Sequence, residues 1–406
     1  MRVPLSKPEI TALDISNVVE VLRSSQLSLG PRVEEFERAF AAYAGTRHAV
    51  AVSSGTAALH LCIRALGIGA NDEVITSSFS FVASANCALY EGALPVFADI
   101  DPVSLNLNPA SVRRFIEEEC TWDAATESLI DRRNGRIVKA LLPVHVFGLP
   151  CDMDSLVELA EEYHLHIVED ACEALGAEYR GKRVGTIGRM ATFAFYPNKQ
   201  MTTGEGGMVV TDSDELARIC RSMRNQGRDE GSVWLHHDRL GYNYRLSDLH
   251  CALGLSQLQR LDAMLAAREN AAAAYSQQLV DESRVSLPRS LDGHRRSWFV
   301  YVLQIKCSDD HSPRQVRDAV ILKLRERGIG SQAYFPAIHC QPYMQQYEFA
   351  VPFPLPFTEA ASDNCLAVPM FAGASAEEIE YVCSGLRQAL DSMGTAIWSQ
   401  PTSVAV

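Results

Sequence analysis

Lys199 could act as a nucleophile that forms an imine with a carbonyl compound. It lies in the segment 192–207, between two apolar stretches and just before a glycine-rich turn. A lysine amine becomes reactive in this way when a desolvated or cationic environment lowers its pKa. Because loop lysines are ordinarily solvated, its position alone favours a surface role, and the interpretation depends on the neighbouring segments.

Asp170 could supply the negative charge that such chemistry uses. It directly follows the apolar run 165–169, so its carboxylate would lie at the carboxyl end of a strand. A carboxylate at this place can pair with a protonated pyridine nitrogen and keep the ring electron-withdrawing. An isolated aspartate there would more often cap a following helix.

Two further segments could bind an anion or a polar ligand. Residues 52–57, Val-Ser-Ser-Gly-Thr-Ala, pass from a strand into a helix, where free backbone N–H groups favour a phosphate. A plain N-cap by Ser54 or Thr56 would explain the same residues. The segment 241–245, Gly-Tyr-Asn-Tyr-Arg, combines aromatic and polar side chains before a helix, and a packed turn capped by Ser247 is the alternative.

The elements that position these segments follow from hydrophobic periodicity. Short apolar runs alternate with helical patterns from residue 48 onward, which is typical of a mostly parallel sheet with helices on both faces. Helices are expected at 55–66 and 153–163. The expected strands are 48–52, 73–76, 94–98, 138–144, 165–169, 191–195 and 208–211. Ligands of such α/β sheets bind at the carboxyl ends of strands, which is where chemistry should be sought.

A smaller α+β domain is expected after this α/β domain. The pattern of residues 247–270 predicts one long helix that leads away from the sheet. A strand at 299–305 and helices at 313–327 and 376–390 then follow. We therefore predict a large domain at 1–262, a small domain at 263–393 and a flexible tail at 394–406.

Bulk composition excludes several classes of protein. A formal charge of −13 without a basic patch disfavours a nucleic-acid partner. Eleven cysteines without a Cys-x-x-Cys pair indicate a reducing compartment rather than a disulfide framework or a metal site. The N-terminus lacks a signal-peptide core and no run of eighteen apolar residues occurs, so we expect a cytoplasmic location away from the membrane.

The spacing from Gly55-Thr56 through Asp170 and Lys199 to Asn243 resembles the DegT/StrS family of nucleotide-sugar aminotransferases. The resemblance covers residues 3–390, and the co-occurrence of its motifs is specific although no single motif is. Besides the four segments above, the motifs are Leu-Ser-Leu-Gly-Pro-Arg at 27–32, Phe-Ser-Phe at 79–81, Val-His-Val-Phe-Gly at 144–148 and Tyr-Phe-Pro-Ala-Ile-His at 334–339.

The resemblance implies an aspartate-aminotransferase-like fold of the α/β class, known as PLP fold type I, with pyridoxal 5'-phosphate (PLP) as cofactor. It also implies a homodimer with active sites at the subunit interface. Lys199 matches the lysine that forms the Schiff base with PLP, and Asp170 matches the partner of the pyridine nitrogen. Phe81 matches the aromatic residue that stacks on the ring.

The cofactor phosphate and the sugar have their own matches. Gly55, Thr56 and Ala57 match the phosphate loop, and Asn243 matches a residue that reaches the phosphate from the neighbouring subunit. Tyr334 and His339 match the small-domain segment that approaches the sugar.

Two positions depart from the family pattern. Ala194 stands where many members have a serine that helps to hold the phosphate, so affinity would rest more on the loop amides, Thr56 and Asn243. Glu173 stands where many members have glutamine near the phenolic oxygen of the ring. An ionised Glu173 would repel a phenolate, and we predict that it is protonated or turned aside.

Three functions are compatible with a fold of this kind. The resemblance implies transfer of an amino group from an amino acid, usually glutamate, to a nucleotide-linked keto sugar, with a 4-keto-6-deoxyhexose preferred over a 3-keto sugar. A PLP-dependent sugar dehydratase typically has histidine in place of Lys199. A non-catalytic sugar-nucleotide-binding regulator would need neither Lys199 nor Asp170. The residues present favour the aminotransferase.

Overall fold

A mixed, mostly parallel sheet forms the centre of the larger domain in the computed structural model, which describes residues 1–229, 231 and 233–398. All seven predicted strands are present, with ends that differ by one or two residues. Among these seven, only β11 runs antiparallel to its neighbours. In spatial order they are β1 (His48–Val52), β11 (Gly207–Thr211), β10 (Met190–Ala194), β7 (His166–Asp170), β6 (Ile137–Leu142), β2 (Asp72–Ser77) and β3 (Leu94–Ala98).

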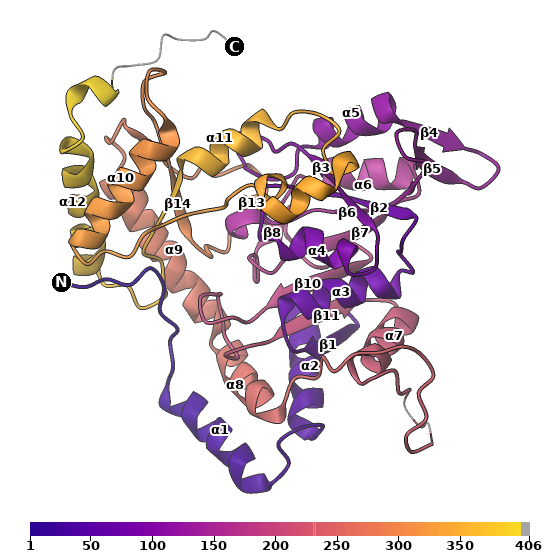
Figure 1. The fold of residues 1–406 in the computed structure, drawn as a ribbon. Coiled ribbons are helices and arrows are strands. Elements are labelled where there is room, and N and C mark those ends of the chain that lie inside the picture. The colour runs from indigo at the N-terminus through magenta and orange to yellow at the C-terminus, as the bar shows by residue number, and fades with distance from the viewer. Residues whose placement is uncertain (230, 232, 399–406) are drawn as a thin grey trace.

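Helices cover both faces of this sheet (Figure 1). One face packs against α3 (Gly55–Ala65), α4 (Ala83–Leu89) and α7 (Asp214–Arg224). The other face packs against α2 (Pro31–Ala44), α5 (Pro109–Glu119), α6 (Met153–Glu162) and α8 (Asp248–Gln259). Each covering helix buries an apolar stripe at helical spacing, as in α2, where Phe36 and Phe40 contact Phe195 and Phe193. The predicted α/β architecture is confirmed.

Small elements extend the edges of this domain. The antiparallel hairpin of β4 (Cys120–Asp123) and β5 (Ser128–Asp131) adds to β6 and was not predicted. A separate sheet joins β8 (Glu178–Tyr179), β9 (Lys182–Arg183) and β13 (His294–Arg295). Short 3-10 helices occur at η1 (Val146–Gly148), η2 (Ile338–Cys340), η3 (Pro342–Gln346) and η4 (Glu348–Ala350).

The single long helix expected at 247–270 is wrong, because two helices occupy this stretch. Helix α8 ends at Gln259, and α9 (Leu261–Gln278) starts after Arg260, whose ψ of 1° departs from helical geometry. The Arg260 guanidinium binds Glu9 and the buried carboxylate of Asp14, which forms a capping box with the N-cap Thr11 of α1 (Ala12–Ser24). Both helices keep apolar residues on their buried sides, so the change of direction leaves no mark in the periodicity.

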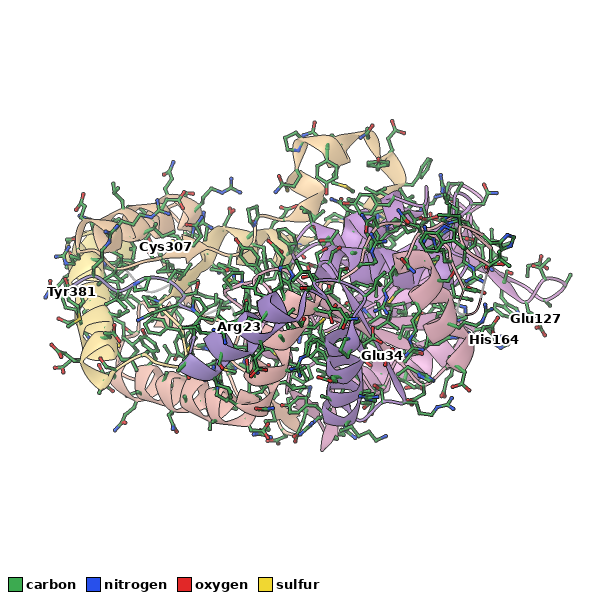
Figure 2. All side chains as sticks on the ribbon, turned by 90° about the horizontal axis from the view of Figure 1, so that it is seen from below. Arg23, Glu34, Glu127, His164, Cys307 and Tyr381 are labelled. Atoms are coloured by element: carbon green, nitrogen blue, oxygen red, sulfur yellow. The ribbon has the colours of Figure 1, made fainter. Side chains whose placement is uncertain are left out.

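The smaller domain contains a four-stranded antiparallel sheet and three helices. The sheet order is β12 (Val285–Ser286), β14 (Tyr301–Ile305), β16 (Cys365–Val368) and β15 (Gln332–Ala333). The helices are α10 (Pro313–Glu326), α11 (Pro356–Asn364) and α12 (Ala376–Asp391). Helix α9 joins this domain to the large one, and the labels Tyr381 and Glu127 mark the opposite ends of the molecule in Figure 2.

Both ends of the described chain pack on the small domain. The backbone of Val3 exchanges hydrogen bonds with Gly328 and Gly330, although residues 1–262 were assigned to the large domain. The first part of the expected tail forms η5 (Thr395–Trp398), whose Trp398 indole donates to the Leu390 carbonyl. Residues 399–406 of that predicted tail lie outside the described residues. Across the described ranges, the helices are too short or too polar to span a membrane.

Candidate active site

A cavity of about 620 Å³ lies where the carboxyl ends of the central strands face the small domain. The large domain contributes residues that directly follow or end β1, β2, β6, β7 and β10. The small domain contributes Phe299 and residues 332–335. Of the residues predicted for the site, those that line this cavity are Gly55, Thr56, Phe81, Asp170, Glu173, Lys199 and Tyr334.

Lys199 reaches the cavity from the loop between β10 and β11, and its side chain is 14% exposed. Its Nζ lies 3.5 Å from Glu173 Oε1 and 3.9 Å from the centre of the Phe299 ring. The lysine amine is therefore enclosed between the face of the Phe299 ring and the Glu173 carboxyl group. A lysine amine is thus present in a largely desolvated cavity, as imine chemistry requires.

Asp170 ends β7, as predicted, and its buried carboxylate is aimed into the cavity. Oδ2 accepts a hydrogen bond of 2.7 Å from the Ser84 hydroxyl, and Oδ1 accepts one of 3.1 Å from the Cys172 N–H. Ser84 is itself held by Ser80 at 2.8 Å. These donors fix the carboxylate and leave it further acceptor capacity for a ligand.

The N-terminus of α3 forms one wall of the cavity. Ser54 caps the helix by accepting from the Ala57 N–H at 3.0 Å, so the N-cap that we gave as the alternative is present. The phosphate-binding role of this loop stays a prediction. Gly55 lies so close to β10 that a Cβ on it would be 2.8 Å from the Ala194 Cβ and 3.0 Å from the Cys172 Sγ. Ala57, whose N–H is already used by the cap, does not line the cavity.

Glu173 is buried and divides its two oxygens between Lys199 and the protein backbone. Oε2 accepts from the Phe147 N–H at 3.0 Å, while Oε1 faces Lys199. Burial raises the pKa of Glu173, and the Lys199 charge and the Phe147 N–H oppose that shift only in part. The side chain is turned towards the lysine, and the choice between a protonated Glu173 and one turned aside from a bound cofactor stays a prediction.

Two aromatic residues face the cavity from opposite domains. Phe81, 60% exposed, follows β2 and presents its ring to the space beside Asp170. Tyr334 enters from the small domain, and burial together with the nearby Glu173 charge raises the pKa of its phenol to about 12. It therefore stays a neutral hydrogen-bond donor at neutral pH.

Besides Ala57, two more predicted residues do not line the cavity of this single chain. Asn243 is exposed, between Tyr242 and Tyr244, whose rings stack at 4.9 Å. His339 accepts or donates at 2.7 Å with the Ser78 hydroxyl, and so contacts the loop before Phe81 rather than the cavity.

Sequence reasoning missed several residues that shape the site. Ser84 holds Asp170 from α4, and Phe299 faces Lys199 from the start of the small domain. Arg268 of α9 binds the Lys199 carbonyl at 3.1 Å. Among these residues, only Arg268 has a sequence signal, because it is a single arginine on an otherwise apolar helix face. That signal does not indicate which residue Arg268 contacts.

The cavity fits a planar pyridine ring that carries a phosphate. Asp170 can pair with the ring nitrogen, Phe81 can cover the ring, and Lys199 can bond to its aldehyde. The free N–H groups of Gly55 and Thr56 at the start of α3 suit the phosphate. Among the described residues, no cluster of His, Cys, Asp and Glu has the arrangement of a metal site.

A lysine, a strand-end aspartate and a helix N-terminus around one cavity, on a mostly parallel sheet with a smaller C-terminal domain, define the aspartate-aminotransferase-like fold of PLP fold type I. Solved structures of aminotransferases with this fold superimpose on the chain. The chain belongs to the DegT/DnrJ/EryC1/StrS aminotransferase family, whose model matches residues 8–387. The protein is therefore a PLP-dependent aminotransferase by family and fold.

Individual relatives cover almost the whole chain. GDP-perosamine synthase from Caulobacter vibrioides is 38% identical over 392 residues, which cover 96% of this chain and 98% of the relative. Helicobacter pylori PseC, an aminotransferase involved in the biosynthesis of pseudoaminic acid, has a TM-score of 0.86 at 28% identity, with 97% and 100% of the chains covered. S. venezuelae DesV, solved with a ketimine intermediate, has a TM-score of 0.81 at 34% identity, with 92% and 93% covered.

Proposed function

We propose that this protein transfers the amino group of an amino acid, L-glutamate, to a nucleotide-linked keto sugar, a 4-keto-6-deoxyhexose. The observation that carries the proposal is the placement of the Lys199 amine and the Asp170 carboxylate in one cavity, open between two domains. The relative named GDP-perosamine synthase supports a nucleotide-linked sugar as the amino acceptor. The carbon that is aminated is inferred from the family preference alone.

The residues of this chain would divide the work as follows. Lys199 would hold the cofactor in the resting protein and, once released by the amino donor, would carry the proton between carbon and nitrogen. Asp170 would keep the ring nitrogen protonated, with Ser84 and the Cys172 N–H fixing its orientation. Bound PLP would supply the electron sink for both half-reactions. Phe81 would hold the ring from one side.

The phosphate of the cofactor would rest on few side chains. Gly55 and Thr56 offer backbone N–H groups and one hydroxyl, and Ala194 lines the cavity without a polar group. The family resemblance assigns a further contact to Asn243 of a second copy of the chain, so the proposal includes a homodimer with shared sites. Exposed apolar side chains near it, among them Val233, Trp234 and Leu240, suit such an interface.

Tyr334 and His339 would act on the sugar side. The neutral Tyr334 phenol faces the cavity and can donate to an oxygen of the sugar. His339 would act more remotely, because it holds Ser78 in the loop that carries Phe81. Both assignments follow the family resemblance and the placement of the segment 334–339 beside the cavity.

The test is an absorbance titration of the purified protein with PLP, followed by glutamate and then by a panel of nucleotide-linked keto sugars. We expect a visible band of lysine-bound cofactor, its loss with glutamate and its return with one keto sugar. Lys199→Ala should lack the band and lose more than about 10³-fold in activity, since proton transfer by a positioned group alone contributes 10²–10⁴-fold. A band that glutamate and the sugars leave unchanged would refute the proposal.

A further inference from the structure

Arg268 is a buried cation that lies behind the Lys199 segment. The side chain belongs to α9, is 4% exposed and donates from Nη1 to the carbonyls of Trp298 and Phe299, at 3.2 Å each. Its Nη2 donates to the Lys199 carbonyl at 3.1 Å. Within the described part of the chain no carboxylate forms an ion pair with it. Burial lowers the pKa of Arg268 to about 10, and the charge of Glu9 opposes that shift only in part.

A charge buried without a counter-ion is costly to the fold. Three backbone carbonyls satisfy part of the guanidinium, and its Nε has no partner among the described residues. A neutral side chain of similar length would pack in the same place without that cost. The position of the charge therefore points to a role beyond packing.

The contacts of Arg268 join the lysine to the start of the small domain. Gln200, the next residue, donates to the carbonyl of Ser297 at 2.9 Å. Lys199 and Gln200 are thus both fixed to residues 297–299, and the Phe299 ring in turn faces the Lys199 Nζ. Arg268 completes this connection by donating to the carbonyls of Lys199, Trp298 and Phe299.

We propose that Arg268 is a positioning residue for Lys199, which fixes the lysine backbone against residues 298–299 and places a permanent positive charge behind its amine. The inference rests on the proposed function, in which Lys199 bonds to the cofactor. A positive charge behind the lysine should disfavour protonation of the imine that it forms with the cofactor, so removing that charge should raise the pH midpoint of the visible band. Glu173, at 3.5 Å, acts in the opposite direction.

Other titratable groups also face Lys199, and all of them stay constant in the test. They are Asp170, Cys172, Glu173, Tyr196, Glu205 and Tyr334, which line the same cavity. Because the variants below change Arg268 alone, a difference between the neutral and the charged replacement isolates its charge.

The experiment measures the pH midpoint at which the visible band of the PLP-loaded protein changes, together with the dissociation constant of PLP and the melting temperature. Arg268→Met and Arg268→Gln remove the charge, and Arg268→Lys keeps it. We expect the midpoint to rise by about 0.5–1 pH unit in the neutral variants and to return towards wild type in Arg268→Lys. Arg268→Gln serves if Arg268→Met does not fold.

Arg317→Met is the matched control. Arg317 is 5% exposed, lies on α10, donates to the Ser362 carbonyl and, unlike Arg268, pairs with Asp318 at 2.8 Å. Its removal also deletes a buried guanidinium, but in the small domain. We expect a lower melting temperature with an unchanged midpoint. A neutral Arg268 variant that melts early with the wild-type midpoint would show a purely structural role and overturn the proposal. Absence of any band in the wild-type protein would instead overturn the proposed function.

Discussion

Glu169 and Asp170 are consecutive carboxylates at the end of β7, yet their surroundings differ completely because neighbouring residues of a strand face opposite sides of the sheet. Glu169 is surrounded by donors: it accepts from the N–H groups of Gly185, Ile187 and Gly188 at 2.6–2.9 Å and contacts His145 at 3.1 Å. Asp170 accepts two protein hydrogen bonds and faces a cavity.

The two carboxylates therefore have different roles. Burial opposes ionisation of Glu169, but the contact with His145 and the backbone donors outweigh it and hold the pKa of Glu169 below its ordinary value. Its bonds reach the loop after β9 and tie that loop to the sheet. Asp170 keeps acceptor capacity for something the chain itself does not supply. A fully satisfied carboxylate indicates structure, and a partly satisfied one beside a cavity indicates binding.

Asp170→Asn should lower the activity rather than the stability of the fold. The amide keeps the shape of the side chain but cannot hold a protonated ring nitrogen by charge, so we expect the transamination rate to fall about 10²–10³-fold. The melting temperature should change little, because Cys172 can still donate to the amide oxygen. Single-turnover kinetics with glutamate measure the loss, and near-wild-type turnover would contradict the assignment.

Glu169→Gln should lower the stability of the fold rather than the activity. An amide cannot accept from three N–H groups and His145 as a carboxylate does, and we expect the free energy of unfolding to fall by about 2–3 kcal/mol. Because the lowered pKa stabilises the fold above the ordinary pKa of a glutamate, the loss should be largest at neutral pH and shrink as the pH falls. Denaturant titrations at several pH values measure it. The folded fraction should keep its turnover, whereas a selective loss of activity would contradict the contrast.

The sequence predicted the ends of the strands better than the contacts that reach them from distant helices. The strand ends and the residues that follow them could be located because apolar runs stop where the cavity begins. Asp170, Lys199 and Gly55 do line the cavity, and their roles there stay predictions. Ser84 and Arg268 gave no comparable signal. Ser84 reaches Asp170 across 86 residues and Arg268 reaches Lys199 across 69, and such pairings depend on the packing of helices that periodicity does not specify.

The fold shows the same division. The seven central strands of the large sheet were predictable, since most of their residues form apolar runs bounded by turns, whereas the added hairpin of β4 and β5 was not. The break at Arg260 depends on ion pairs with Glu9 and Asp14, about 250 residues earlier in the chain. The contribution of Val3 to the small domain depends on a backbone pairing with Ile329. Asn243 stays a prediction, because its assigned partner belongs to a second copy of the chain.

Glu73 is a third buried carboxylate that can be compared with Glu169 and Asp170, and it lies at the opposite end of the strands. It lies near the start of β2, is fully buried, and accepts from the Asn134 amide at 2.7 Å, while its Oε2 has no partner among the described residues. Burial raises the pKa of Glu73 to about 7, and the nearby charge of Asp131 adds to the shift. Glu73 does not line the active-site cavity, so this unsatisfied carboxylate has a cost for stability and no ligand there to offset it.

Glu73→Gln should therefore stabilise the protein at high pH. The folded pKa of about 7 lies above the ordinary value of 4.5, so the wild-type carboxyl binds its proton more tightly when folded. The wild-type free energy of unfolding then decreases as pH rises from about 4.5 to 7, and the glutamine variant should gain about 1–3 kcal/mol across this window. Thermal melts at pH 5 and pH 8 measure the gain. The exposed Glu158→Gln is the control, and an equal gain at both pH values would contradict the prediction.

Glu173→Gln tests the case in which a buried carboxylate does face the cavity. Glutamine can still accept from the Phe147 N–H, and it no longer forms an ion pair with Lys199 in the cofactor-free chain. Its amide can also donate to a phenolic oxygen, which an ionised carboxylate would repel. We expect the affinity for PLP to rise by up to about tenfold, which corresponds to about 1.4 kcal/mol.

The pH dependence separates these causes. Because burial raises the pKa of Glu173, the wild-type residue is protonated at low pH and resembles glutamine there. The difference in PLP affinity between the two proteins should therefore widen as the pH rises and Glu173 ionises. Equilibrium titrations of the apoprotein with PLP from pH 6 to 9 measure it. Glu205→Gln is the matched control, since it removes a charge from the same cavity at an exposed position without contact to Lys199. A difference that does not vary with pH would mean that Glu173 keeps one protonation state throughout, and that its contact with Lys199 does not compete with the cofactor.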